Sequence, residues 1–482
     1  MATNNNLHIV EPRTNTIHVL CIGGSGLRVL RSLIMLFSSG YDIPGYIIRP
    51  YIIDPHLQSE DLKFVTELIA KYQKLQSNDN KGFFKVPLSI DNMDNLNVMK
   101  VDNTQQQSFG DFIGYKNFGH QSDEQYIVDM LYSGLNLDKS MSVGFKGSPN
   151  VGSVVFQEFI NGEWFQKNFS NLTSNDKIIL IGSLFGGTGA SGIPAIAKEL
   201  KSKSKQTKIS AITLTPYFKL KKPDQKMLDK DIDSDIFNIK SLAALNYYNQ
   251  NNPGIDNFYV IGDSMGEDYE YDEVKQGNKA HFIELVSATA IKHFAITDDE
   301  NNNMWNMFFT DELKPTMLYD DCGDGLNDVI FCLANFYAFC KFFILMKKER
   351  FYPFNRLFYK EILENQDNSD KIKLLDDLIY NSENTDSYIR WLGELRDNTR
   401  SFNVINTSDI KSPYGQISYY SFEPQTNNPV FNGTEKLIKR NMSDYFLSIN
   451  NCYRKSLRTT DQINEVAKFL NISYSGIIEV NS

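Results

Sequence analysis

Apolar runs of strand length alternate with helical patterns along the first 300 residues. Runs such as IHVLCIGG (17–24) and KIILIGS (177–183) are apolar throughout, which is typical of strands buried on both faces of a sheet. Segments such as SEDLKFVTELIAKYQKL (59–75) repeat apolar residues at helical spacing. Further strands are predicted at 46–55, 208–218 and 257–263, and further helices at 27–37, 193–202 and 236–250. Strand, crossover helix, strand predicts an α/β fold whose N-terminal, mostly parallel sheet carries helices on both faces.

This alternation fades near residue 300, where TDDENNN (297–303) is expected to connect two domains. We expect an extended or disordered N-terminal segment over 1–15, an N-terminal domain over 16–300 and a C-terminal α+β domain over 301–482. In the C-terminal domain, QISYYSF (416–422) and SGIIEV (475–480) are interpreted as β pieces.

Net charge and cysteine content argue against two classes of protein, general nucleic-acid binders and disulfide-stabilised proteins. The net charge is −10 with both signs interleaved, which disfavours general nucleic-acid binding, and five cysteines without a CxxC pair argue against a disulfide framework. The N-terminus is polar and unlike a secretory signal, so a cytoplasmic location is expected. The run VIFCLANFYAFCKFFILM (329–346) is long enough to span a membrane, but Asn335 and Lys341 interrupt it. It is interpreted as a buried amphipathic helix, with no membrane span.

Three glycine-rich loops follow strand-like runs or precede helical ones. They are CIGGSG (21–26), VGFKGSPNVG (143–152) and SLFGGTGASG (183–192). Glycine lets the backbone approach an anion, and the N–H groups at a helix N-terminus point toward it. A side chain at Gly187 or Gly189 is expected to occupy phosphate space, and Pro194 is expected in the first turn of the following helix. The third loop is therefore predicted to hold a phosphate group.

Two known nucleotide-binding motifs, the Walker P-loop and the Rossmann GxGxxG, match these loops only in part. No lysine follows Gly189 or Gly192 as a Walker P-loop requires. A Rossmann dinucleotide site is an alternative, because Asp54 ends the second strand, but Val29 replaces the third glycine of GxGxxG. A nicotinamide-dependent oxidoreductase remains open on these residues.

The order and spelling of the three loops resemble the tubulin/FtsZ superfamily over roughly residues 16–295. GGTGASGIPAIAKEL is similar to the signature loop GGGTGTG and its helix, VGFKGSPNVG to the loop GAGGNPEVG, and VLCIGGSG to the first glycine loop. ITLTPYF and IDNFYVIGD are similar to the strands that follow. The resemblance implies a domain that binds GTP or GDP with Mg²⁺. Phe185 departs from the family, which has a further glycine there.

The resemblance also implies roles for particular residues. Asp54 would lie near Mg²⁺ or the γ-phosphate, although an acid at this position can equally cap the following turn. The core helix is expected near 278–296, with guanine or ribose contacts at its start and on the preceding helix. The implied phosphate-binding residues are Gly23, Gly24, Ser25, Gly147, Ser148, Pro149, Gly186, Gly187, Thr188, Gly189 and Ala190, and the implied base or ribose contacts are Asn238, Asn278, His281 and Phe282.

Family members hydrolyse GTP when a neighbouring subunit supplies an acidic loop, and its usual spelling NxDxxE is missing here. The acidic loop YDDCGDGLNDV (319–329) is the candidate, with Asp320, Asp321, Asp324 or Asp328 acting in trans; a solvated acidic loop is the alternative. The chain is expected to assemble head to tail with itself and to serve an unknown cargo or effector protein. A scaffold that binds nucleotide without hydrolysing it is the second hypothesis.

Overall fold

The computed structural model of the chain describes most of its 482 residues. The described residues are 15–93, 96–99, 107–142, 144–145, 147–221, 234–263, 267–270, 278–297, 304–309, 325–347, 365–380, 387–402, 405, 416–424, 433–457 and 465–481.

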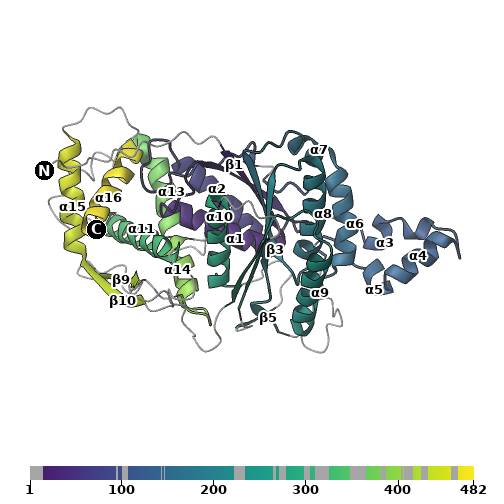
Figure 1. Cartoon of the computed structure of the whole chain (residues 1–482). Coiled ribbons are helices and arrows are strands. Elements are labelled where there is room, and N and C mark those ends of the chain that lie inside the picture. The colour runs from purple at the N-terminus through teal and green to yellow at the C-terminus, as the bar shows by residue number, and fades with distance from the viewer. Residues whose placement is uncertain are drawn as a thin grey trace.

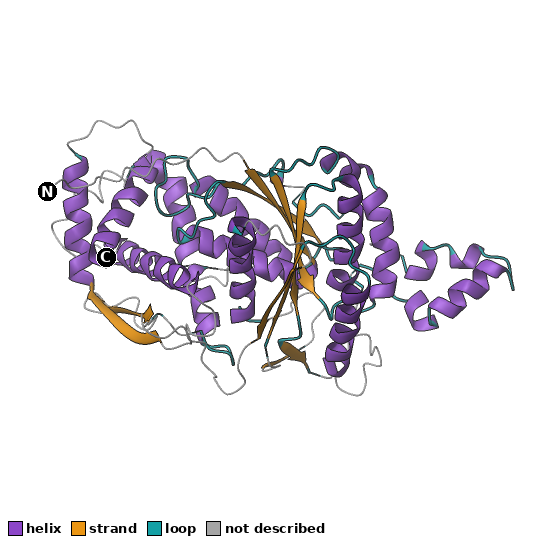
Figure 2. Ribbon diagram, in the orientation of Figure 1, coloured by secondary structure: helices purple, strands orange, loops and turns teal. Residues whose placement is uncertain are grey.

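A six-stranded sheet forms the centre of the molecule (Figure 2). Its strand order is β2-β1-β3-β4-β6-β8, and every neighbouring pair is parallel. The strands are β1 (Asn15–Ile22), β2 (Tyr46–Ile53), β3 (Asp176–Ser183), β4 (Lys208–Leu214), β6 (Asn257–Gly262) and β8 (Met304–Phe309). The predicted α/β class and the five predicted strands are confirmed. β8 lies beyond residue 300 and still pairs with β6, so the sheet continues past the expected domain boundary.

Helices cover both faces of this sheet (Figure 1). Along β1, Val19 and Cys21 belong to one hydrophobic cluster, whereas Leu20 and Ile22 belong to another, as the two-residue period of a strand requires. The first cluster contains α1 (Gly23–Ser38), α2 (Glu60–Leu75) and α10 (Phe282–Ile296); the second contains α6 (Pro149–Asn161), α7 (Glu163–Asn168) and α8 (Thr188–Lys203), and α9 (Phe237–Gln250) packs on it through Tyr248. Two short strands, β5 (Phe218–Leu220) after β4 and β7 (Glu267–Tyr269) after β6, form a separate parallel pair.

A small group of helices projects from the α6 side of the molecule (Figure 1). We call residues 107–142 the arm. It contains α3 (Phe109–Phe112), the 3-10 turn η2 (Tyr115–Asn117), α4 (Asp123–Leu131) and α5 (Gly134–Leu137). No residue of α4 is buried.

The C-terminal part packs on the α1 and α2 side. It comprises α11 (Gly325–Lys347), α13 (Ser369–Ile379), α14 (Tyr388–Arg396), α15 (Met442–Ser456), α16 (Glu465–Asn481) and the antiparallel pair β9 (Gln416–Pro424) and β10 (Gly433–Asn441). β9 confirms the predicted strand at 416–422. Of the helices described, one stretch, Asp328–Lys347, is long and apolar enough to cross a membrane, and 89% of its most apolar window is buried within the chain. This agrees with its interpretation as a buried helix.

The predicted strand at 475–480 is wrong, because these residues lie in α16. Buried Val466, Phe469, Leu470, Ser473 and Ile477 recur at helical spacing over a longer window than the six residues interpreted as a strand. Gly476 lies against α15, where a Cβ would come within 2.5 Å of the Ile449 Cα, so the helix pair can approach closely only at glycine.

Candidate functional site

The strand order β2-β1-β3 makes a topological switch point between β1 and β3. The helix after β1 lies on one face of the sheet and the helix after β3 on the other, so their first turns diverge at the carboxyl edge. Open α/β sheets bind ligands in the crevice at such a switch point. The first and third glycine loops lie here.

All three glycine loops meet around Thr188. Gly23 has φ of +71°, and a Cβ built on it would lie 3.1 Å from the Thr188 Cβ. Gly144 has φ of +82°, and its Cβ would lie 3.5 Å from the Thr188 hydroxyl oxygen. A Cβ on Gly187 would lie 3.1 Å from the Gly147 backbone nitrogen. Segments more than 120 residues apart in the sequence are therefore brought together, as the sequence predicts.

The expectation that side chains at Gly187 and Gly189 would fill phosphate space is wrong. The Gly187 Cβ would lie 2.8 Å from the Cβ of Phe145, and the Gly189 Cβ would lie 2.7 Å from the backbone nitrogen of Ser183. Protein atoms occupy both positions, so these glycines allow the loops to pack on one another. Gly24 differs, because it is exposed and its Cβ would meet nothing within 4 Å.

The helix after the third loop begins earlier than predicted. α8 starts at Thr188, so Pro194 lies inside the helix and not in its first turn. The prediction placed the start near residue 193 because glycine and alanine give no apolar periodicity. An earlier start puts the first-turn amides of Thr188, Gly189 and Ala190 directly at the loop junction. Such amides have no acceptor within the helix, and the helix dipole adds positive potential there.

Two lysines reach the second glycine loop. Lys139 is 6% exposed and its ammonium donates to the Ser148 hydroxyl at 2.8 Å, and the Lys240 ammonium donates to the Gly147 carbonyl at 2.8 Å. Ser148 precedes α6, which begins at Pro149. These cations add positive charge beside the loops. Sequence reasoning missed both, since neither lysine belongs to a glycine motif and the fold alone brings them close.

Asp54 lies directly after β2 and is 5% exposed. Its Oδ1 accepts the His56 amide at 2.9 Å, and Asn97 Nδ2 donates to the Asp54 carbonyl at 2.7 Å. Burial raises the pKa of this carboxyl to about 7. The turn-capping alternative is thus present in the structure. No group of three or more metal-ligating side chains occurs among the described residues.

Two of the residues expected to contact the base, His281 and Phe282, make contacts within the protein instead. His281 is 4% exposed and caps α10, its Nδ1 accepting the Ile283 amide at 3.1 Å. Burial lowers the pKa of His281 to about 4. Phe282 is fully buried with its ring stacked on Phe402 at 5.0 Å. Asn238 is exposed and Asn278 half-buried. The structure gives no support to base contacts from His281 or Phe282.

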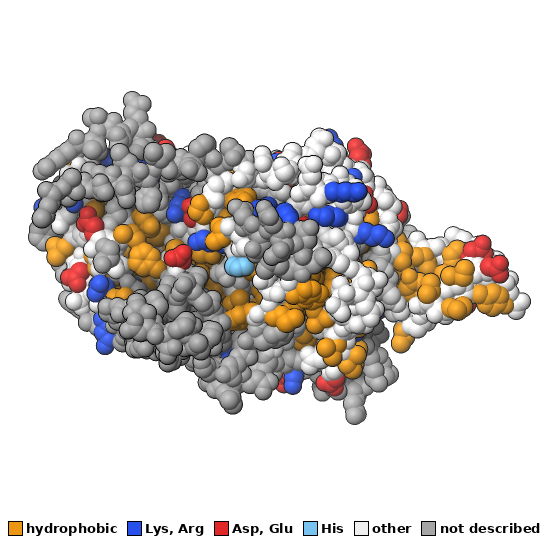
Figure 3. All heavy atoms as spheres, viewed as in Figure 1, with side chains coloured by type: hydrophobic (Ala, Val, Ile, Leu, Met, Phe, Trp, Pro, Cys, Tyr) orange, Lys and Arg blue, Asp and Glu red, His pale blue; other side chains and the backbone are white. Residues whose placement is uncertain are grey.

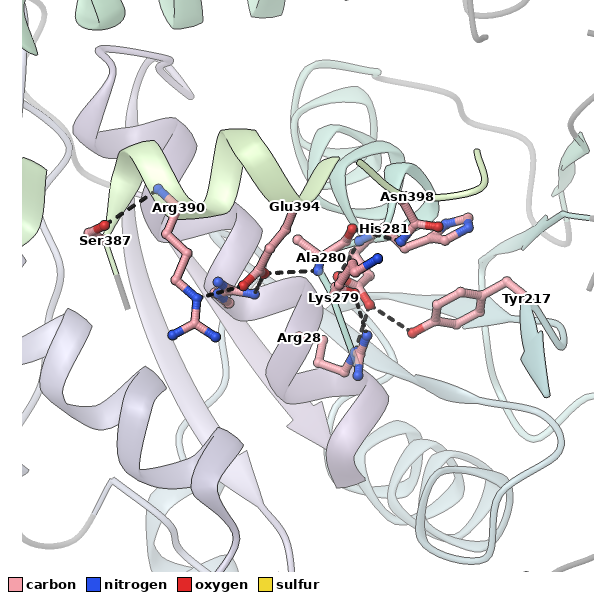
Figure 4. Close-up of polar contacts among 11 residues, drawn as sticks. Arg28, Tyr217, Lys279, Ala280, His281, Ser387, Arg390, Glu394 and Asn398 are labelled. Atoms are coloured by element: carbon pink, nitrogen blue, oxygen red, sulfur yellow. Dashed lines mark hydrogen bonds and ion pairs between the residues drawn. The ribbon is translucent and has the colours of Figure 1, made fainter. Parts of the chain in front are cut away.

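His281 belongs to a polar network around the start of α10 (Figure 4). Arg28 of α1 donates to Glu284 at 2.6 Å, Tyr217 donates to the same oxygen at 2.9 Å, and the other Glu284 oxygen accepts the His281 amide at 3.0 Å. Arg28 and Glu284 are both buried.

The same network reaches α14. Glu394 accepts from Arg31 at 2.9 Å and from the Ala280 amide at 3.0 Å, and Asn398 donates to the Ala280 carbonyl at 3.0 Å. The helix that begins at the first glycine loop is therefore tied by two arginines to α10 and to the C-terminal part.

The acids expected to act in trans are only partly placed. Asp320, Asp321 and Asp324 lie outside the described residues. Asp328 is exposed in the first turn of α11 and contacts the Lys292 ammonium at 3.3 Å.

No family model matches the chain, and no curated protein matches it. Among solved structures, the chain is similar to CetZ from Methanosaeta thermophila, with a TM-score of 0.31 and 15% sequence identity. The alignment covers 60% of this chain and 56% of the CetZ chain, so the chain spans little more than half the length of that structure.

Proposed function

We propose that the chain binds a guanine nucleotide, GTP or GDP, together with Mg²⁺, in the crevice between β1 and β3. The meeting of the three glycine loops around Thr188, at the start of α8, carries this proposal. The resemblance of these loops to the tubulin/FtsZ superfamily supports it and supplies the guanine preference. A nicotinamide dinucleotide is less favoured, because the sheet order 2-1-3 differs from the 3-2-1 order of Rossmann dinucleotide domains.

In this proposal the phosphates lie against the first-turn amides of α8 and the Thr188 hydroxyl. Gly24 and the half-exposed Ser25 border the same space from α1. Lys139 and Lys240 offset phosphate charge from the second loop, where the Lys240 ammonium lies 2.8 Å from the Gly147 carbonyl oxygen. Charge-assisted contacts of this kind are stronger than neutral ones.

Asp54 is proposed as the one protein carboxylate that ligates Mg²⁺. Mg²⁺ commonly takes one or two carboxylates and completes its shell with phosphate oxygens and water. A bound Mg²⁺ would neutralise phosphate charge and favour the ionised form of Asp54, whose pKa burial raises to about 7.

Nucleotide binding is proposed to control head-to-tail assembly. A heterologous contact extends into a filament unless its geometry closes a ring. Hydrolysis, where it occurs, needs a water-activating acid from the next subunit, for which Asp320, Asp321, Asp324 and Asp328 are the candidates. A non-hydrolysing scaffold is the second candidate function. Asp328, the one of these acids that the structure describes, is exposed and lies 3.3 Å from the Lys292 ammonium.

Replacing Thr188 with valine tests the site while keeping the shape of the side chain. We expect Thr188→Val to weaken binding of fluorescently labelled GTP by about 10- to 150-fold, because a lost hydrogen bond to a charged group costs about 1.5–3 kcal/mol. Thr66→Val, in the middle of α2 where the hydroxyl donates to the Leu62 carbonyl, is the matched control and should bind normally. Equal affinity of both variants and wild type would reject the assignment. Competition by ATP tests the base: we expect it to be weaker than competition by GTP.

A further inference from the structure

Exposed apolar side chains gather on two elements that the nucleotide site does not use. Among the described residues, sixteen large hydrophobic side chains are exposed, and nine of them lie on the arm or on α9 and the residue before it. On the arm these are Tyr126, Ile127, Met130, Leu131 and Leu135, exposed by 52% to 86%, and we call them the arm face. On α9, Ile239, Leu242 and Tyr247, exposed by 45% to 66%, form the α9 face.

The arm face is a continuous apolar patch and not a set of scattered surface residues. Tyr126, Ile127, Met130 and Leu131 are spaced so that they share one side of α4, and Leu135 extends that side onto α5. Figure 3 shows these apolar side chains covering the projecting arm, with further ones over the lower part of α9. Monomeric proteins rarely expose apolar patches much larger than a few hundred Å², and larger ones usually mark interaction sites.

The two faces also differ in charge in a way that suits a mutual contact. The arm carries five acidic residues and two lysines, one of which, Lys139, is buried against Ser148. α9 contains one lysine and no acidic residue. Two arms brought together would repel through five acidic residues on each, whereas an arm against α9 meets a single exposed acid, Asp235, in the turn just before the helix.

We propose that the arm face of one copy docks on the α9 face of a second copy. The two faces together present on the order of 800 Å² of apolar surface, which with a polar rim reaches the roughly 1,000 Å² that a specific interface needs. Because the faces differ, the contact is heterologous: the copy whose arm docks keeps a free α9, and the copy whose α9 is covered keeps a free arm, so further neighbours can add. The contact requires no nucleotide, so it stands apart from the proposed function.

Paired substitutions and their mixture test this contact in the nucleotide-free protein by sedimentation velocity. The arm variant is Met130→Asp with Leu135→Asp, and the α9 variant is Ile239→Asp with Leu242→Asp. We expect wild type to self-associate and each variant to need at least roughly tenfold more protein to do so. Leu447→Asp with Leu457→Asp, two leucines of 59% exposure on and after α15, is the matched control and should behave like wild type.

A mixture of the arm variant and the α9 variant distinguishes an arm-to-α9 contact from other modes of self-association. The arm variant retains an intact α9 face and the α9 variant an intact arm, so mixing them should give a 1:1 complex that grows no further. A wild-type chain that stays monomeric, an arm variant that associates normally, or a mixture that stays monomeric would overturn the proposal. An α9 variant that associates like wild type beside a monomeric arm variant would indicate arm-to-arm pairing and would also overturn it. Unchanged thermal midpoints would show that the variants fold, and Thr188→Val should associate normally whether or not the chain binds nucleotide.

Discussion

At the scale of single residues, Gly187 and Gly24 have opposite surroundings in the same site. A Cβ on Gly187 would lie 2.8 Å from the Phe145 Cβ, so Gly187→Ala should lower stability by about 1–3 kcal/mol through overpacking. Chemical denaturation of the nucleotide-free protein measures this. A variant as stable as wild type would contradict the packing of the second and third loops.

Gly24→Ala should instead preserve stability and weaken nucleotide binding. Its Cβ would meet no protein atom within 4 Å, so we expect stability to be kept or slightly raised. The methyl group would instead enter the space assigned to phosphate, and the affinity for labelled GTP should fall. Unchanged affinity would mean that phosphate does not lie beside the first turn of α1.

The burial of Asp54 predicts a distinctive pH dependence of the free energy of unfolding. Burial raises its pKa from 3.8 to about 7, so between these values the native state holds a proton that the unfolded state has released. The free energy of unfolding should therefore fall as pH rises through this window, by at most about 1.4 kcal/mol per pH unit. Asp54→Asn should remove that component.

His281 acts in the opposite sense, so the comparison must be made at each pH. Burial lowers its pKa from 6.5 to about 4, which makes the unfolded state the better proton binder and raises stability with pH over that range. Subtracting the wild-type profile from that of Asp54→Asn cancels this contribution. Parallel profiles for the two proteins would show that Asp54 is not buried as a neutral acid.

At the scale of elements, the buried Arg28–Glu284 pair fixes α1 against α10. Removing one partner leaves an uncompensated buried charge, so Arg28→Met or Glu284→Leu alone should destabilise by about 3–5 kcal/mol. The double variant should lose less than the sum of the two, because both charges leave together. Additive losses in a denaturant double-mutant cycle would contradict a direct coupling across the 2.6 Å contact.

Elements with strong periodicity were predictable from the sequence, and those set by packing were not. Five strands and the amphipathic α2 follow from runs of seven or more patterned residues. The start of α8 was missed because Thr188, Gly189 and Ala190 carry no apolar pattern, and helix α16 was misread because Gly476 and its neighbours resemble a short strand. The polar network around Glu284 joins residues more than 250 positions apart, which no local pattern encodes.

At the scale of the whole molecule, the sequence predicted that three loops would share a site but not how they touch. The parallel sheet places the carboxyl ends of β1 and β3 together, which follows from topology. The contact of Gly187 with Phe145 and the approach of Lys139 and Lys240 depend on the folded path of the second loop, which has no periodicity of its own.

Assembly should couple turnover to protein concentration. If a neighbouring subunit supplies the acid, the rate of GTP hydrolysis per chain should rise steeply with concentration, with light scattering rising in parallel. Scattering without any hydrolysis would favour the scaffold. A constant, non-zero rate per chain without scattering would contradict head-to-tail completion of the site.

The identity of the nucleotide that the protein carries distinguishes guanine-nucleotide binding from nicotinamide-dinucleotide binding. Purified protein is denatured, and the released small molecules are separated by ion-pair chromatography and identified by mass spectrometry. We expect GTP or GDP in near-equimolar amount from wild type and Thr66→Val, and much less from Thr188→Val. Release of a nicotinamide dinucleotide, or wild-type protein that releases no nucleotide and also fails to bind labelled GTP with Mg²⁺, would contradict it.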